Sequence, residues 1–235
     1  MKYITFILGL ISFNCYSQDT LYSVDSEFNK FMSIGKLKVH KFEGKVKSFR
    51  YSNRDSTVFD PIYFITDYVG GKMNGSRLIY SNEGKLISSY QVRNDSLNGF
   101  HIYYQDTLIT IIEYYNNNSR NGSTIGYDNN KLFSIEEYKD DKATGLYIEF
   151  YNNGKVKAKG NQLDGLRTGE WIEFDSTYSY YFTGKYNPKI YWTYEHTNKG
   201  STSMQHFTYE KVGVWIKYSI TGLKIEEYNY AQTSK

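Results

Sequence analysis

The stretch Thr144-Gly-Leu-Tyr-Ile-Glu-Phe-Tyr-Asn-Asn-Gly-Lys-Val156 decides the fold. Ile148 stands three residues after Gly145, and the aromatic Phe150 stands five residues after it. Side chains alternate between the two faces of a β-strand, so these two positions share one face and position +2 points to the other. In an α-helix, positions +3 and +5 would lie about 200° apart and could not form one apolar face. The stretch therefore predicts a strand, followed by a turn at Asn153-Gly154.

The pattern of this stretch recurs at intervals of 23 or 24 residues. Each unit has a glycine followed by Leu or Ile at position +3 and by Tyr or Phe at position +5. The glycines are Gly75, Gly99, Gly122, Gly145, Gly169 and Gly213. The last interval is 44 residues, about twice the period, so a degenerate unit is expected around Lys189. A regular period of this length is typical of repeat proteins, in which each unit buries its apolar residues against its neighbours.

Turn residues separate the expected strands. The steps read as tight turns are Asn74-Gly75, Asn98-Gly99, Asn121-Gly122, Asn153-Gly154, Glu83-Gly84, Asp106-Thr107 and Asp175-Ser176-Thr177. Each unit thus contains two short strands and two turns, and the 26 Tyr and 14 Phe residues favour strands as well. We predict an all-β fold, an elongated, twisted antiparallel sheet of stacked β-hairpin repeats of about 23 residues.

The first residues have the features of a signal peptide. Lys2 precedes a short apolar run, and Cys15 and Ser17 place small residues before an expected cut that leaves Gln18 as the new terminus. The run is shorter than the roughly 20 apolar residues of a membrane-spanning helix. Acylation of Cys15 is the alternative, disfavoured by the bulky Phe13 nearby. We expect an exported chain, periplasmic, in the cell envelope or extracellular, and without cysteine after cleavage.

Three segments are therefore predicted. Residues 1–17 form the signal peptide, residues 18–69 an N-terminal cap with degenerate repeats, and residues 70–235 the repeat array. In the cap, apolar residues from Val24 to Met32 are spaced for one face of a short helix, which Ser23 would cap.

The repeat units resemble those of a known family. The runs Thr168–Phe174, Thr144–Val156 and Val214–Tyr218 are similar to MORN-type repeats, and most similar to the variant in bacterial antitoxin-like proteins of the YwqK type. The resemblance covers roughly residues 70–230. It implies a string of β-hairpins that form one elongated sheet with a role in binding or scaffolding, and the family has no common catalytic residues to carry over.

Little in the sequence points to catalysis or to nucleic acid. The net charge of +3 is too small for a protein that binds nucleic acid by bulk electrostatics. The four histidines (His40, His101, His196 and His206) have no metal-binding spacing, and the glycines precede strands rather than the helices of phosphate-binding loops. We therefore expect a non-enzymatic protein with no metal, no cofactor and no transmembrane span in the mature chain.

Position +2 of the repeat units is unusually rich in aromatic residues, which the repeat pattern itself does not require. Position +2, opposite the Ile/Tyr face, carries Arg77, His101, Tyr147, Trp171, Tyr191 and Trp215. Either the coiling of the sheet covers this second face, or its aromatic residues form an exposed binding track. The sequence thus predicts an exported binding or scaffold module for a protein or glycan partner. The alternatives are a toxin-neutralising, immunity-like protein and a cell-envelope polysaccharide hydrolase.

Overall fold

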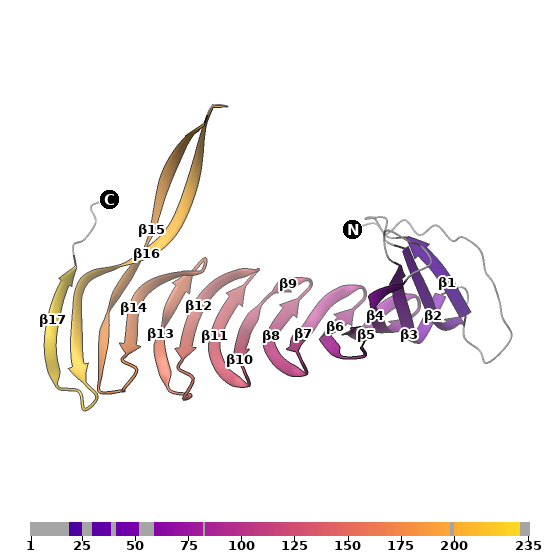
Figure 1. Cartoon of the computed structure of the whole chain (residues 1–235), viewed down its shortest axis with the longest axis horizontal. Coiled ribbons are helices and arrows are strands. Elements are labelled where there is room, and N and C mark those ends of the chain that lie inside the picture. Colours follow the sequence, from indigo (N-terminus) through magenta and orange to yellow (C-terminus); the bar gives the residue numbers. More distant parts are fainter. Residues whose placement is uncertain are drawn as a thin grey trace. The chain divides into compact units, whose positions relative to one another are not determined.

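In a computed structural model, the described residues are 19–24, 30–38, 41–51, 59–81, 83–197 and 200–230. They form strands and turns, and no helix occurs among them, so the all-β prediction is confirmed (Figure 1). The strands are β1 (Asp19–Val24), β2 (Lys30–Lys38), β3 (Lys41–Tyr51), β4 (Phe59–Val69), β5 (Lys72–Tyr80), β6 (Leu86–Arg93), β7 (Ser96–Gln105), β8 (Leu108–Asn116), β9 (Ser119–Arg120), β10 (Gly122–Asp128), β11 (Lys131–Lys139), β12 (Lys142–Phe150), β13 (Val156–Leu163), β14 (Leu166–Phe174), β15 (Tyr180–Thr197), β16 (Gly200–Ser219) and β17 (Lys224–Tyr230).

The chain divides into two compact units, Met1–Ser119 and Arg120–Lys235. In unit 1, each strand from β1 to β7 pairs antiparallel with the strand that follows it. In unit 2, the strands from β10 to β17 do the same. Both units are therefore stacks of sequential β-hairpins, as the period predicted. No helix in the described part of the chain is long and apolar enough to cross a membrane.

The short helix predicted in the cap is wrong where the structure describes it. Val24 lies in β1, and Phe31 and Met32 lie in β2, where β1 and β2 pair antiparallel. A single short amphipathic turn is a weak helix former, and pairing of the two strands satisfies the same backbone groups. Phe28 and the expected signal peptide fall outside the described residues.

The hairpin turns of the array differ in part from the expected ones. Seven two-residue turns have both central residues at positive φ: Gly70-Gly71, Asn94-Asp95, Asp106-Thr107, Asn117-Asn118, Asn129-Asn130, Asp140-Asp141 and Asp164-Gly165. Asn and Asp tolerate this left-handed backbone, which matches the twist of the paired strands. The turns predicted at Asp106-Thr107, Glu83-Gly84, Asn153-Gly154 and Asp175-Ser176-Thr177 are confirmed.

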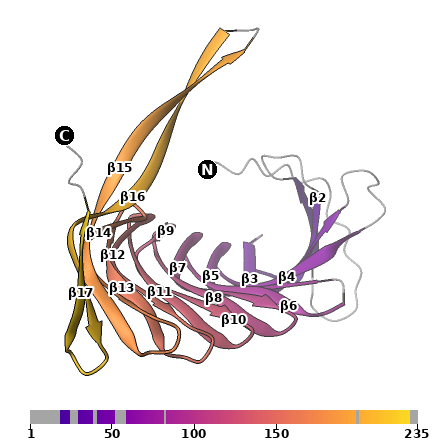
Figure 2. The same ribbon diagram turned by 60° about the vertical axis from the view of Figure 1, so that its left-hand side comes forward.

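The turns predicted at Asn74-Gly75, Asn98-Gly99 and Asn121-Gly122 are wrong. The first two glycines lie inside β5 and β7, each opposite an irregularity in the neighbouring strand, and Gly122 is the first residue of β10. All three have positive φ, from +114° to +127°. Within the strands they are β-bulges, which bend the strand and sharpen its twist. Figure 2 shows that the strands of unit 2 are bent along their length.

The Asn before each of these glycines forms a hydrogen bond to the next turn. Its side-chain amide donates to the first turn residue one unit later, as Asn98 does to Asn117 (3.2 Å) and Asn121 to Asp140 (3.0 Å). The second turn residue accepts a backbone N–H, as Asn118 does from Leu97 (2.7 Å). The Asn-Gly step therefore recurs because its Asn side chain joins successive hairpins. Its period correctly indicates the repeat, although the step itself forms a bulge and not a turn.

Replacing Gly99 by Val is expected to destabilise the protein by at least about 1–3 kcal/mol, because a β-branched residue is strained at a φ of +114°. A Cβ atom there would also lie 2.0 Å from the side-chain oxygen of Gln91. The matched control is Ser96→Val, at the start of the same strand, which should change the melting temperature little. Equal thermal melts of the two variants would contradict the assignment of a bulge at Gly99.

The buried residues of both units lie on one face of the sheet, the face that carries the +2 positions. We call it the inner face. Its buried members include Val46, Thr66, Val92, Glu113, Ala143, Ala158, Trp171, Tyr186 and Trp215. The +3 residues Ile125, Ile148 and Ile172 lie on the opposite, outer face and remain partly exposed; the first two both pair with Ile135 of β11. Phe174, at position +5, follows Ile172 in the unbroken register of β14 with β15 and so shares its face. The predicted sharing of one face by +3 and +5 is thus confirmed.

The degenerate unit expected around Lys189 does not form a separate stacked hairpin. Instead β15 and β16 are longer than their neighbours, and their pairing continues from Lys185↔Val212 to Thr197↔Gly200. In Figure 1 this hairpin extends beyond the other strands of unit 2. We call the part that extends, residues 187–210, the arm.

Candidate binding surface

Trp171 and Trp215 are core residues of unit 2, and each is only 1% exposed. The indole N–H of Trp171 donates to the backbone oxygens of Asn161 (3.0 Å) and Thr168 (3.2 Å). The indole N–H of Trp215 donates to the oxygen of Lys185 (3.0 Å). The prediction of an exposed aromatic track is therefore wrong at these two residues. The other interpretation of the sequence, in which the sheet covers this face, is correct there.

Two glycines explain why the indoles are buried. Gly160 pairs with Trp171 across β13 and β14, and a Cβ atom on it would lie 2.4 Å from the indole ring. Gly184 lies in the same relation to Trp215. The missing side chains let each ring lie against the backbone of the neighbouring strand, and the bent sheet closes around them. These glycines recur 24 residues apart, a period in the sequence that indicates the buried positions of the two indoles.

The other predicted residues are placed in different surroundings. Tyr147 packs against Trp171, with ring centroids 5.9 Å apart. Tyr191 pairs with His206 on the arm, and its side chain is outside the described residues. Arg77 and His101 lie on the inner face of unit 1, both in register with Tyr90.

A row of alternating charges lies over the two indoles. Glu149 accepts from Lys157 (2.6 Å) and lies 3.6 Å from Arg167. Glu173 pairs with both Arg167 and Lys211, each at 2.8 Å. The guanidinium of Arg167 lies 4.2 Å from the Trp171 ring, and the ammonium of Lys211 lies 3.9 Å from the Trp215 ring. These cation–π contacts and ion pairs hold the charged groups in fixed positions.

The carboxylate of Glu173 stays ionised in this row. Burial by itself raises the pKa of the carboxyl, but hydrogen bonds from Lys211 and Tyr186 outweigh burial and lower the pKa below its usual value. The hydroxyl of Tyr186 donates to Glu173 at 2.6 Å, and burial together with this bond raises the pKa of Tyr186. The row is therefore a fixed structural network with no free acid or base.

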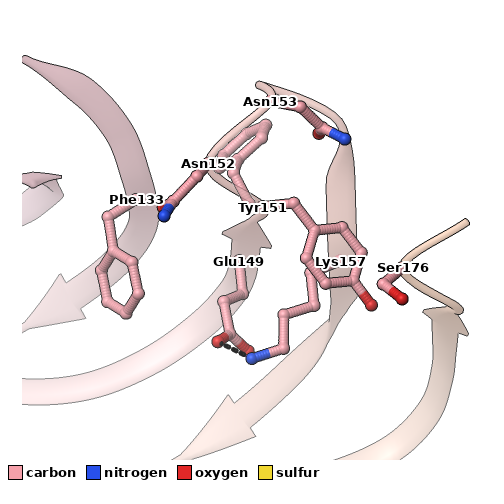
Figure 3. Close-up of a pocket in the computed structure, with 8 residues that line it drawn as sticks. Phe133, Glu149, Tyr151, Asn152, Asn153, Lys157 and Ser176 are labelled. Atoms are coloured by element: carbon pink, nitrogen blue, oxygen red, sulfur yellow. Dashed lines mark hydrogen bonds and ion pairs between the residues drawn. The ribbon is translucent and has the colours of Figure 1, made fainter.

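An open pocket of about 430 Å³ adjoins the end of this row (Figure 3). Its lining consists of three aromatic residues, two amides, one hydroxyl and the Glu149–Lys157 pair: Phe133, Phe150, Tyr151, Asn152, Asn153, Ser176, Glu149 and Lys157. These residues come from β11, β12, β13 and the turns at the ends of β12 and β14. Figure 3 shows the Phe133 ring on one side of the pocket and the Tyr151 ring on the other.

The pocket walls are held by contacts of their own. The Tyr151 hydroxyl donates to the backbone oxygen of Phe174 (2.7 Å), and the Asn153 side chain accepts from the N–H of Lys155 (3.0 Å). The Phe133 ring is 46% exposed although it lines the pocket. The sequence does not predict this pocket, because apart from Phe150 at position +5 its residues follow none of the positions that define the repeat, and Asn153 is predicted only as part of a turn.

The arrangement supplies an aromatic surface, hydrogen-bond donors and acceptors, and one neutralised ion pair. Among the described residues, no group of three or more His, Cys, Asp or Glu side chains is placed to hold a metal ion. No family model matches the chain, and no curated protein matches it either.

Proposed function

We propose that this protein is an exported, non-enzymatic β-repeat binding module, and that the pocket beside Phe133 binds a glycan. The observation that carries the proposal is the combination of an exposed aromatic ring with clustered amide, hydroxyl and carboxylate groups in one preformed cavity. Apolar walls with a few placed polar groups are the usual composition of small-ligand sites. Export follows from the apolar leader and its small-residue cut site.

The chemistry of the lining favours a sugar over other ligands. A pyranose ring presents C–H groups that pack on an aromatic face, and its hydroxyls both donate and accept hydrogen bonds. The side chains of Asn152 and Ser176, which also line the pocket, can both donate and accept such hydrogen bonds. Glu149 and Lys157 neutralise each other, so the pocket offers a donor and an acceptor without an unpaired charge. A neutral, hydroxylated ligand fits this balance better than an ionic one.

Binding is a better proposal than hydrolysis of the glycan. Glycosidases use two carboxyl groups that flank the scissile bond. Glu149 is the one carboxylate among the lining residues, and it is paired with Lys157 and Arg167. The neighbouring acidic residue Glu136 accepts from the Tyr138 hydroxyl (2.7 Å), and Glu137 accepts from the N–H of Leu146 (3.0 Å). Both thus have structural hydrogen bonds.

A protein partner is the second candidate, favoured by the arm. Phe207 and Tyr209 share one face of β16 there and are 60% and 40% exposed, and Met204, on the other face of the strand, is 61% exposed. Exposed apolar side chains grouped on a projecting hairpin are typical of protein contacts. A toxin-neutralising role would belong to this second candidate.

Replacing Phe133 by Ala is expected to weaken glycan binding at least tenfold, because the exposed ring is lost while the fold keeps its core. The mature chain is first screened on a glycan array, and the best ligand is then titrated by calorimetry. The matched control is Phe207→Ala on the arm, which removes the same kind of ring, more exposed than Phe133, from the same unit. If glycan binding survives Phe133→Ala, or if no glycan binds, the proposal for the pocket is wrong; loss of a captured protein in Phe207→Ala alone would favour the second candidate.

A further inference from the structure

Arg77 differs from the other ring-stacked arginines of the described chain. Its guanidinium lies 4.6 Å from the Phe64 ring and 5.9 Å from the Tyr90 ring on the inner face of unit 1. Arg120 and Arg167 stack on rings in the same way, at 4.1 Å and 4.2 Å. Arg120 has Asp141 beside it, however, and Arg167 has Glu173 at 2.8 Å. Among the described residues, Arg77 has no carboxylate partner.

The hydrogen bonds of Arg77 are also incomplete. One terminal nitrogen donates to the sulfur of Met73 at 3.4 Å, and sulfur is a weak acceptor. The Nε atom is buried and has no hydrogen-bond partner among the described residues. A partly buried cation with unpaired donors costs free energy, and a carboxylate is the group that matches its planar fork. The site therefore favours an anionic group from outside the chain.

A second unpartnered nitrogen lies on the same face. Tyr90 is in register with Arg77 on one side and with His101 on the other. The Nε2 atom of His101 is hydrogen-bonded to the Ser88 hydroxyl (2.7 Å), whereas its Nδ1 atom is buried without a partner. The two side chains thus flank one tyrosine and leave one unpaired nitrogen each.

We propose that Arg77 binds the carboxylate of a uronic-acid sugar, with the sugar ring against Tyr90 and its hydroxyls toward His101. The carboxylate takes the position against Arg77 that Glu173 takes against Arg167 in unit 2. One guanidinium neutralises one negative charge, which matches a carboxylate better than a phosphate monoester with a charge of about −1.5 to −2. The choice of a sugar rests on the proposed function, whereas the choice of a carboxylate rests on Arg77 and its surroundings.

The test uses the mature full-length chain labelled with ¹⁵N and follows the Nε–H signal of Arg77 by NMR during titration. Galacturonate is the probe, and its methyl ester is the matched neutral control. Galacturonate should shift the Arg77 signal and bind at least tenfold more tightly than the ester. Arg77→Gln should remove this difference, Arg77→Lys should keep only part of it, and Arg93→Gln, at an exposed arginine of β6, should leave it unchanged.

Several outcomes would overturn the proposal. Equal binding of the acid and the ester, or an undiminished difference in Arg77→Gln, would show that no carboxylate site exists at Arg77. Tighter binding of N-acetylglycine than of galacturonate would assign the site to a peptide carboxylate instead of a sugar. A thermal melt of Arg77→Gln, combined with the unshifted signals of unit 2, separates lost binding from lost folding. Failure of the Phe133 pocket would remove the reason for choosing a sugar but leave the carboxylate result at Arg77 intact, because the two sites lie in different units.

Discussion

Replacing Trp171 and Trp215 together by Ala is expected to unfold unit 2. Both indoles are almost fully buried, and truncation of a buried Trp costs about 3–5 kcal/mol in unfolding free energy. The sum is comparable with the whole stability of a typical domain, about 5–15 kcal/mol. Each variant also leaves backbone oxygens without the indole N–H that they accept. Urea unfolding followed by circular dichroism measures the loss.

The control is a pair of exposed apolar residues in the same unit. Leu163→Ala with Phe207→Ala removes similar side chains that are more than half exposed, and the midpoint should move little. A double Trp variant that melts like the wild type would contradict the buried placement and restore the exposed track that the sequence allowed. A double Trp variant that loses binding but keeps its unfolding midpoint would also support the exposed track.

Replacing Gly160 by Val is expected to destabilise unit 2 by about 3 kcal/mol or more, because the new Cβ would lie 2.4 Å from the ring of Trp171. The backbone at Gly160 is outside the positive-φ region, so valine meets no conformational strain there. Valine also has a higher intrinsic preference for β-strands than glycine, which by itself would favour the substitution. The contact with the indole is therefore the whole cause of the loss, which thermal and urea melts record.

Two further variants isolate that contact. Lys159→Val changes the neighbouring exposed residue on the outer face and should be nearly neutral. In the Trp171→Ala background, Gly160→Ala should cost at least about 1 kcal/mol less than in the wild type, since the ring that it meets is gone. Additive effects of the two substitutions would show that Gly160 and Trp171 do not pack together.

The placement of Arg167 and Lys211 shows how closely the core and the charged surface are connected. Both cations lie on the indoles and both pair with Glu173. Their charges could be read from the sequence, but their partners come from strands that meet only in the folded sheet. The pocket beside Phe133 has the same origin, since its residues come from three strands and two turns.

The strands of the repeat array, their order and their period follow from the sequence. Alternation of Ile148 and Phe150 on one face, the spacing of the glycines and turn residues such as Asp106-Thr107 are local properties, because backbone sterics and side-chain period act over a few residues. The long hairpin of β15 and β16 escaped this reasoning, because a double interval is equally compatible with one long hairpin or two short ones.

Which face is buried follows from the packing between strands and not from the sequence pattern. A period of two residues separates two faces but does not say which one becomes concave. The bulges at Gly75 and Gly99 and the close contact of Trp171 with Gly160 set that choice through bending and packing between strands. Burial of Trp171 and Trp215 depends on Gly160 and Gly184 lying directly beneath the indoles, and pairing of the strands is what places these glycines there.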